Sequence, residues 1–226
     1  MLGVRWSVGD VFKVLALSFI SCVALIILLS LLFIPVIGII GVETPFFLIL
    51  SSFHILLLIF TAYYLKRRGC SFRDVGLTIV KLKYIVAGIL LGAALLIVSA
   101  AMSYLTEPLF GSSMIQESLM ELTEMPELLP PLLIFGALIA PIIEELYFRG
   151  FAYLAFKSRF GTRMGIFISA LFFAVMHLDI PVFIEILVIG IILTYAYEKT
   201  KSLPLVITAH IFNNALALYP LLNLQP

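Results

Sequence analysis

Two adjacent carboxylates lie inside a long apolar stretch, where a charged side chain is costly. The stretch runs from Leu129 to Phe156 and contains Glu144, Glu145 and, one helical turn further on, Arg149. A charge near the centre of a bilayer costs at least about 2.5–3.5 kcal/mol, so such residues face a protein interior or a wet cavity and usually serve a function. Glu145 and Arg149 stand at i and i+4, the spacing of a helical ion pair. This pairing predicts that the two charges neutralise each other and that Glu144 remains for chemistry.

Three more polar residues lie at comparable depth in later apolar stretches. At a rise of 1.5 Å per residue, Glu144, His177 and Asn214 each lie about 20 Å from the basic residues flanking their helices, and His210 lies about 13 Å from them. His210 and Asn214 are also at i and i+4 and share one helical face. Asn213 points elsewhere and is expected to pack or to bond a neighbouring helix. The agreement in depth indicates one polar site built from several helices.

Hydrolysis is the chemistry that this set of side chains could perform. Glu144, oriented with His177, could take a proton from a water that attacks a peptide carbonyl. His210 and the Asn214 amide could donate to the developing oxyanion, at about 3–4 kcal/mol per donor. Alternatively, Glu144, His177 and His210 could hold a zinc ion with one open position. No His-Glu-x-x-His sequence is present, and we prefer the metal-free arrangement while leaving both open.

The composition places these residues in a membrane protein. Of 226 residues, 63% are hydrophobic and only 12% are charged, and the apolar runs repeatedly reach membrane-spanning length. The formal net charge of +1 gives no indication of nucleic-acid binding. Cys22 and Cys70 fall in a predicted helix and a predicted cytoplasmic loop, so no disulfide is expected. The first apolar run, at about 27 residues, is too long for a cleavable signal peptide.

Seven apolar segments are the predicted transmembrane helices of an all-α membrane domain. Their bounds are 14–40, 46–65, 84–105, 129–156, 164–178, 182–197 and 203–222. A tight turn is expected at Glu43 and Pro45, and Gly88 with Gly92 forms a small-xxx-small pair that permits close helix packing. We predict a three-helix part over residues 1–128 with an acidic outer loop, and a four-helix core over residues 129–223 with a polar cavity. Within the loop, Gln116 to Leu128 could form an amphipathic surface helix.

The distribution of basic residues predicts the orientation. With a cytoplasmic N-terminus, the cytoplasmic segments are 1–13, 66–83, 157–163 and 198–201. All of the 14 Lys and Arg residues except Arg149 then lie in those segments, as the positive-inside rule requires. We therefore predict a multi-pass protein of the cell membrane with its N-terminus in the cytoplasm.

The polar residues resemble the motif series of a known family. The type II CAAX prenyl protease and bacteriocin-processing (Rce1/ABI, CPBP) intramembrane proteases have similar motifs, in the same order on consecutive helices. The matching motifs here are Glu144-Glu145-x-x-x-Arg149, Phe173-x-x-x-His177 and His210-x-x-x-Asn214. The basic loop from Arg67 to Leu77 is also similar to that family's loop before the third span.

The resemblance implies a glutamate-dependent or metal-dependent endopeptidase acting on a membrane-associated, possibly prenylated, peptide. It implies that Glu144 and His177 activate water and that His210 and Asn214 stabilise the oxyanion. Glu145, Arg149 and Phe173 would have supporting roles. The expected partners are the lipid bilayer and this peptide substrate.

Two other functions fit the same residues. A proton-coupled transporter could use the carboxylate and the histidines as a relay, although no internal repeat supports it. A non-catalytic membrane chaperone or immunity factor could be built on the same fold. His54 has no matching partner in the sequence and is interpreted as structural, and Glu185 lies near the outer end of its span, where its side chain could reach the interface.

Overall fold

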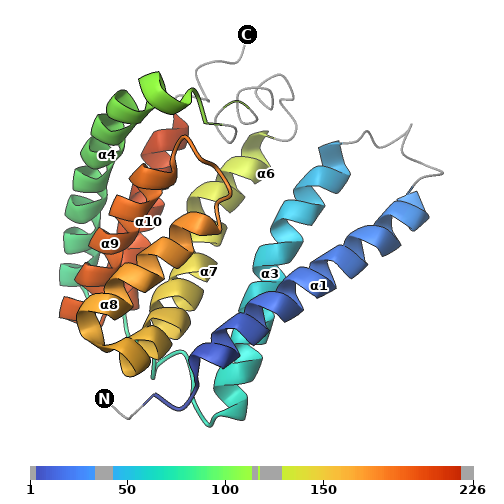
Figure 1. The fold of residues 1–226 in the computed structure, drawn as a ribbon, viewed down its shortest axis with the longest axis horizontal. Helices are drawn as coiled ribbons and strands as arrows, with labels where there is room; N and C mark the ends of the chain where they lie inside the picture. The colour runs from blue at the N-terminus through green and yellow to red at the C-terminus, as the bar shows by residue number, and fades with distance from the viewer. Residues whose placement is uncertain (1–3, 34–42, 114–116, 118–128, 220–226) are drawn as a thin grey trace.

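The chain is mainly helical in the part that a computed structural model describes, which is residues 4–33, 43–113, 117 and 129–219. No strand occurs in those ranges, and the prediction of an all-α fold is confirmed. Figure 1 shows two long helices as a pair on one side and the remaining helices grouped on the other. The pair consists of α1 (Val8–Phe33) and α3 (Glu43–Arg67), which pack against each other.

The helix α1 begins six residues before the predicted start at residue 14. The backbone N–H of Ser7 and its hydroxyl both contact Asp10 Oδ2, at 2.9 and 3.1 Å, and the Asp10 N–H donates back to Ser7 Oγ. This reciprocal capping box satisfies N–H groups that a helix start leaves without partners. Hydropathy alone missed it, because Asp10 and Lys13 interrupt the apolar run. The predicted end of this span, residues 34–40, lies outside the described residues.

The turn predicted at Glu43 and Pro45 is wrong, because α3 already begins at Glu43. Proline is tolerated in the first turn of a helix, where its missing N–H would have no intrahelical partner. The next helix, α4 (Leu82–Phe110), runs five residues past its predicted end and contains Pro108. The predicted surface helix 116–128 lies outside the described residues, apart from residue 117.

Two glycines bring α4 against the last helix, α10 (Leu203–Leu218). A Cβ on Gly88 would lie 2.7 Å from the Leu205 carbonyl oxygen, and one on Gly92 would lie 2.7 Å from that of Ala209. Only hydrogen fits at these two positions. The close packing predicted from the small-xxx-small pair is therefore confirmed, and its partner is the helix that carries His210.

The carboxylate motif lies on a run of helical segments from residue 129 to the turn at residue 161. These are α6 (Leu129–Ile134), the π-helix η2 (Phe135–Ile139), α7 (Ala140–Glu145), the π-helix η3 (Leu146–Tyr153) and the start of α8 (Leu154–Val175). Gly161 has φ 79° and breaks α8, which matches the predicted loop at 157–163. Beyond it, α8 packs on α9 (Phe183–Thr200).

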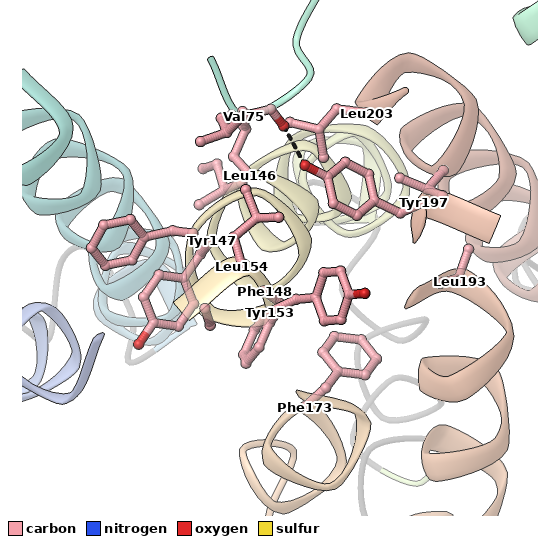
Figure 2. Close-up of a cluster of buried hydrophobic side chains, with 14 of the residues drawn as sticks. Val75, Leu146, Tyr147, Phe148, Tyr153, Leu154, Phe173, Leu193, Tyr197 and Leu203 are labelled. Atoms are coloured by element: carbon pink, nitrogen blue, oxygen red, sulfur yellow. Dashed lines mark hydrogen bonds between the residues drawn. The ribbon is translucent and has the colours of Figure 1, made fainter. Parts of the chain in front are cut away.

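The loop between α3 and α4 is attached to the bundle around η3. The Tyr197 hydroxyl donates to the carbonyl of Val75 at 2.7 Å, as Figure 2 shows, and the Leu203 N–H donates to that of Gly76 at 3.0 Å. Val75 is fully buried among Leu146, Leu203 and other core residues. The N-terminal segment also docks here, since Trp6 Nε1 donates to the carbonyl of Phe151 at 2.8 Å.

The helices include several of membrane-spanning length. Within the described residues, three stretches are long and apolar enough to cross a bilayer, namely Val8–Leu31, Leu82–Phe110 and Pro130–Val175. The last of these includes the break at Gly161, and the apolar α10 is shorter. The chain is a membrane protein, whereas seven crossings and the division after residue 128 stay predictions.

Candidate active site

The carboxylate motif is placed by an irregular stretch of helix. The Ala140 N–H donates to the carbonyl of Phe135, five residues earlier, which defines the wide turn of η2. Pro141 follows in the first turn of α7, where it cannot donate to an earlier carbonyl. A second wide stretch, η3, begins directly after Glu145. Single π-turns are rare and frequently occur at functional sites.

The predicted ion pair between Glu145 and Arg149 is present and fully buried. Arg149 Nη1 lies 2.7 Å from Glu145 Oε1, and neither side chain is exposed to solvent. The Arg149 guanidinium also lies over the Phe173 ring, 4.2 Å from its centroid. A cation over a ring face is attracted by the ring quadrupole, and more strongly when desolvated. Phe173 thus supports the ion pair from α8.

Glu144 lies beside His54 and His210. Its Oε1 is 3.1 Å from His54 Nε2, and its Oε2 is 3.8 Å from His210 Nε2. The carboxylate also interacts electrostatically with His177. The structure thus brings His210 against Glu144, and His54 joins the pair from α3, whereas the role of His177 beside them stays a prediction.

His177 lies just beyond the end of α8 and is held from one side. Its Nδ1 is 2.8 Å from the carbonyl oxygen of Phe173, and its ring lies edge-on to the Phe173 ring at 4.6 Å. Since a carbonyl only accepts, Nδ1 carries the proton, and the Nε2 of a neutral ring is an acceptor. Such a nitrogen can accept a hydrogen bond from a water.

His210 connects the two adjacent carboxylates. Its Nδ1 donates to Glu145 Oε1 at 2.9 Å, while its Nε2 faces Glu144. The contact of His210 with Glu145 was not predicted from the sequence. Glu144 and Glu145 point about 100° apart on their helix, yet one imidazole reaches both through its opposite nitrogens.

Asn214 is held by the irregular helix rather than by His210. Its Nδ2 donates to the carbonyl of Gly136 in η2 at 3.2 Å. An amide group has two N–H donors, so this contact leaves a second one. Asn213 is buried in α10, in keeping with the packing expected of it, and its amide donates to Asn214 Oδ1 at 3.4 Å. Glu185 also lies apart from the site, where it accepts from Ser103 on α4 at 2.8 Å.

The arrangement does not fit the zinc alternative. In the described ranges, no group of three or more His, Cys, Asp or Glu side chains is placed to hold a metal ion. The Nδ1 bonds of His210 to Glu145 and of His177 to Phe173 leave the Nε2 atoms as the available nitrogens, but these are not gathered with Glu144 in a metal-binding geometry. We therefore derive no step through a metal.

His54 is the site residue that sequence reasoning missed. It stands twelve residues before Lys66, which places it about 18 Å from the basic loop, at nearly the depth of Glu144. The depth comparison used for the other polar residues was applied only to the last four spans. Extended to the second span, it would have placed His54 with the group.

Comparison with known proteins finds similar membrane peptidases. Residues 126–216 match the family described as type II CAAX prenyl endopeptidase Rce1-like. The resemblance to the type II CAAX proteases is confirmed over these residues. The chain is 30% identical over 152 residues to the membrane-embedded CAAX protease MroQ of Staphylococcus aureus (strain USA300). It is 23% identical over 117 residues to the putative membrane peptidase YdiL of Bacillus subtilis (strain 168).

These alignments leave part of each protein uncovered. They cover 62% of this chain and 60% of MroQ, and 52% of this chain and 47% of YdiL, so the chain spans less than two thirds of either relative. No solved structure matches the chain. The Rce1-like segment contains Glu144, His177, His210 and Asn214, whereas His54 lies outside it.

Proposed function

We propose that this chain is an intramembrane endopeptidase in which Glu144 and His177 activate a water. The observation that carries the proposal is the placement of His54 and His210, from two separate helices, against one carboxylate inside the bundle, with His177 near enough to act on it electrostatically. A carboxylate inside a membrane-spanning segment is energetically costly, and such residues usually serve a function. The Rce1-like match and the names of the two relatives support peptidase chemistry.

The proposed reaction begins with a water between Glu144 and His177. Glu144 Oε2 takes one proton while the other hydrogen donates to His177 Nε2, and the water oxygen attacks the peptide carbonyl carbon. The carbonyl electron pair moves to its oxygen to form the oxyanion. When the C–N bond breaks, Glu144 returns its proton to the leaving amine, so that the carboxylate is regenerated.

The oxyanion requires N–H donors, and we assign them to His210 and Asn214. Because Nδ1 of His210 donates to Glu145, its Nε2 can donate only when the ring is protonated on both nitrogens. Glu145 Oε1 lies 2.9 Å from Nδ1 and Glu144 Oε2 lies 3.8 Å from Nε2, so both nitrogens face carboxylates. Asn214 offers its second N–H, and Gly136 fixes the amide. Each donor is worth about 3–4 kcal/mol.

The test uses the purified protein in detergent and quenched fluorescent peptides with and without a farnesyl cysteine. The prenylated probe is included because the matched family is named for prenyl endopeptidase activity. We expect Glu144→Gln to lower kcat by at least about 100-fold, the lower end of what general acid–base catalysis contributes. The matched control, Glu185→Gln, removes a membrane glutamate outside the site and should keep wild-type activity.

Two outcomes would count against the proposal. Cleavage that persists in Glu144→Gln would remove this residue from the chemistry. Cleavage that a chelator abolishes and zinc restores would replace the metal-free mechanism. We expect cleavage to be insensitive to the chelator.

A further inference from the structure

His54 makes the shortest contact described for the Glu144 side chain. Its Nε2 lies 3.1 Å from Glu144 Oε1, and the two side chains are equally buried, each 15% exposed. Since a carboxylate only accepts hydrogen bonds, the imidazole Nε2 carries the proton and donates. A hydrogen bond to an ionised group is about twice as strong as one between neutral groups.

Neighbouring aromatic rings hold the imidazole in place. The His54 ring lies edge-on to Phe135 of η2, with centroids 5.4 Å apart, and edge-on to Phe53 of its own helix at 5.8 Å. The helix α3 contacts both α7 and η3, so its position relative to Glu144 is set by packing along the motif helix. The ring therefore has a defined orientation toward Oε1.

The two oxygens of Glu144 consequently have different surroundings. Oε1 is held by His54 from α3, whereas Oε2 faces His210 from α10. An oxygen that accepts a strong hydrogen bond is less available for a proton. Fixing Oε1 thus leaves Oε2 as the base and sets the plane of the carboxylate relative to His177 and the water.

We propose that His54, which lies outside the Rce1-like segment, is a positioning residue that holds Oε1 of Glu144 so that Oε2 faces the reacting water. This inference rests on the proposed function, in which Glu144 is the general base. His54 itself touches neither the water nor the peptide. Its contribution is the orientation of the carboxylate, and the N-terminal helix pair thereby becomes part of the catalytic unit.

The test compares two substitutions of His54. His54→Phe keeps the ring packing but removes the donor, and we expect kcat to fall by about 100-fold with little change in KM, because a 1 Å misplacement of a reacting group costs roughly that much. His54→Gln places an amide N–H near the former Nε2 and should restore most of kcat. Both are assayed with whichever of the two peptides the wild type cleaves.

A packing control separates positioning from support of the fold. Leu57 lies one turn further along α3, is 2% exposed and belongs to the hydrophobic core. Leu57→Ala loosens α3 without removing a donor to Glu144. We expect it to lower the apparent unfolding temperature at least as much as His54→Phe while kcat stays near wild type. The proposal would be overturned if the loss of kcat followed the loss of unfolding temperature across His54→Phe, His54→Gln and Leu57→Ala. It would also be overturned if His54→Gln did not restore kcat.

Failure of the proposed function would look different. If wild type and Glu144→Gln give the same result with both peptides, the proposed role of Glu144 as general base fails, and the His54 contact is judged on stability alone. In that case the unfolding temperatures of His54→Phe, Glu144→Gln and the double variant are compared. If the unfolding temperature of the double variant falls by less than the sum of the two single shifts, the proposed interaction between His54 and Glu144 is supported. Additive shifts in unfolding temperature overturn it.

Discussion

The Arg149 guanidinium neutralises the buried carboxylate of Glu145 and also lies over the Phe173 ring. Replacing it by Met preserves much of the side-chain volume but leaves the Glu145 charge without its cation. Removing one partner of a buried pair costs about 3–5 kcal/mol. We expect Arg149→Met to lower stability by that amount, measured by chemical unfolding in detergent or lipid.

The double variant Glu145→Gln/Arg149→Met is the control for this interpretation. It removes the uncompensated charge, so it should be more stable than Arg149→Met alone. Glu145 also accepts from His210 Nδ1, and the double variant should therefore stay inactive even where it folds. Equal stability of the single and double variants would show that charge compensation is not what Arg149 provides.

At this scale, local pairs could be predicted and pairs between distant segments could not. The Glu145–Arg149 contact follows from i, i+4 spacing on one helix, which the sequence displays directly. The contacts of Glu144 with His54 and of Glu145 with His210 join residues 90 and 65 positions apart. They depend on which helices pack side by side and on how each helix is rotated about its axis. Hydrophobic patterning determines neither in a membrane protein, because the lipid-facing side of a helix is apolar as well.

At the scale of the elements, the contact between α4 and α10 is sensitive to the addition of a single methyl group. A Cβ on Gly92 would meet the Ala209 carbonyl at 2.7 Å and Phe212 Cβ at 2.9 Å. We expect Gly92→Ala to push α10 away from α4 and to displace His210, which follows Ala209. The measurements are unfolding temperature and peptide cleavage, and both should fall.

The matched control for this prediction is Gly9→Ala in the first turn of α1. There a new Cβ would have only an ordinary contact, 3.5 Å from Ser7 Oγ. This variant should be at least as stable as wild type, because alanine favours a helix by about 1 kcal/mol over glycine. If Gly92→Ala behaved in the same way, the close packing at this glycine would not be required for the site.

Helix existence was predictable at this scale, but helix irregularity was not. Long apolar runs predict helices because a bilayer offers no partner for unpaired backbone groups. The π-turns at 135–139 and 146–153 have no signature in composition, and only Pro141 marks the region as unusual. Their consequence for the site is specific, since the wide turn of η2 presents the Gly136 carbonyl to Asn214.

For the molecule as a whole, Glu198 ties the ends of several helices together just past the predicted sixth span. It accepts from Lys157 Nζ at 2.7 Å and from the Tyr153 hydroxyl at 2.6 Å, and it pairs with Lys201. Burial alone would raise the pKa of Glu198, but these hydrogen bonds outweigh it and lower the pKa from 4.5 to about 2. The folded state therefore binds this proton more weakly than the unfolded state.

A group whose pKa is lowered by folding stabilises the fold above its unfolded pKa, and this contribution is lost as the pH falls toward the folded value. We expect the wild-type unfolding temperature to decline between pH 4.5 and pH 2 more steeply than that of Glu198→Gln, which lacks the titrating group. Thermal scans across this range check the expectation. Parallel curves for the two proteins would show that the Glu198 network does not contribute.

The orientation of the whole chain in the membrane can be tested with its own cysteines. Cys22 is buried in α1, whereas Cys70 lies in the basic loop that precedes α4. The positive-inside rule places this loop in the cytoplasm. A membrane-impermeant maleimide should then label Cys70 only after cells expressing the protein are permeabilised, and Cys70→Ser should abolish the signal.

Ser112→Cys, in a Cys70→Ser background, puts an exposed thiol beyond the other end of α4 and should be labelled in intact cells. Labelling of Cys70 in intact cells would reverse the orientation and place the basic loops outside, against the charge distribution that predicted the topology.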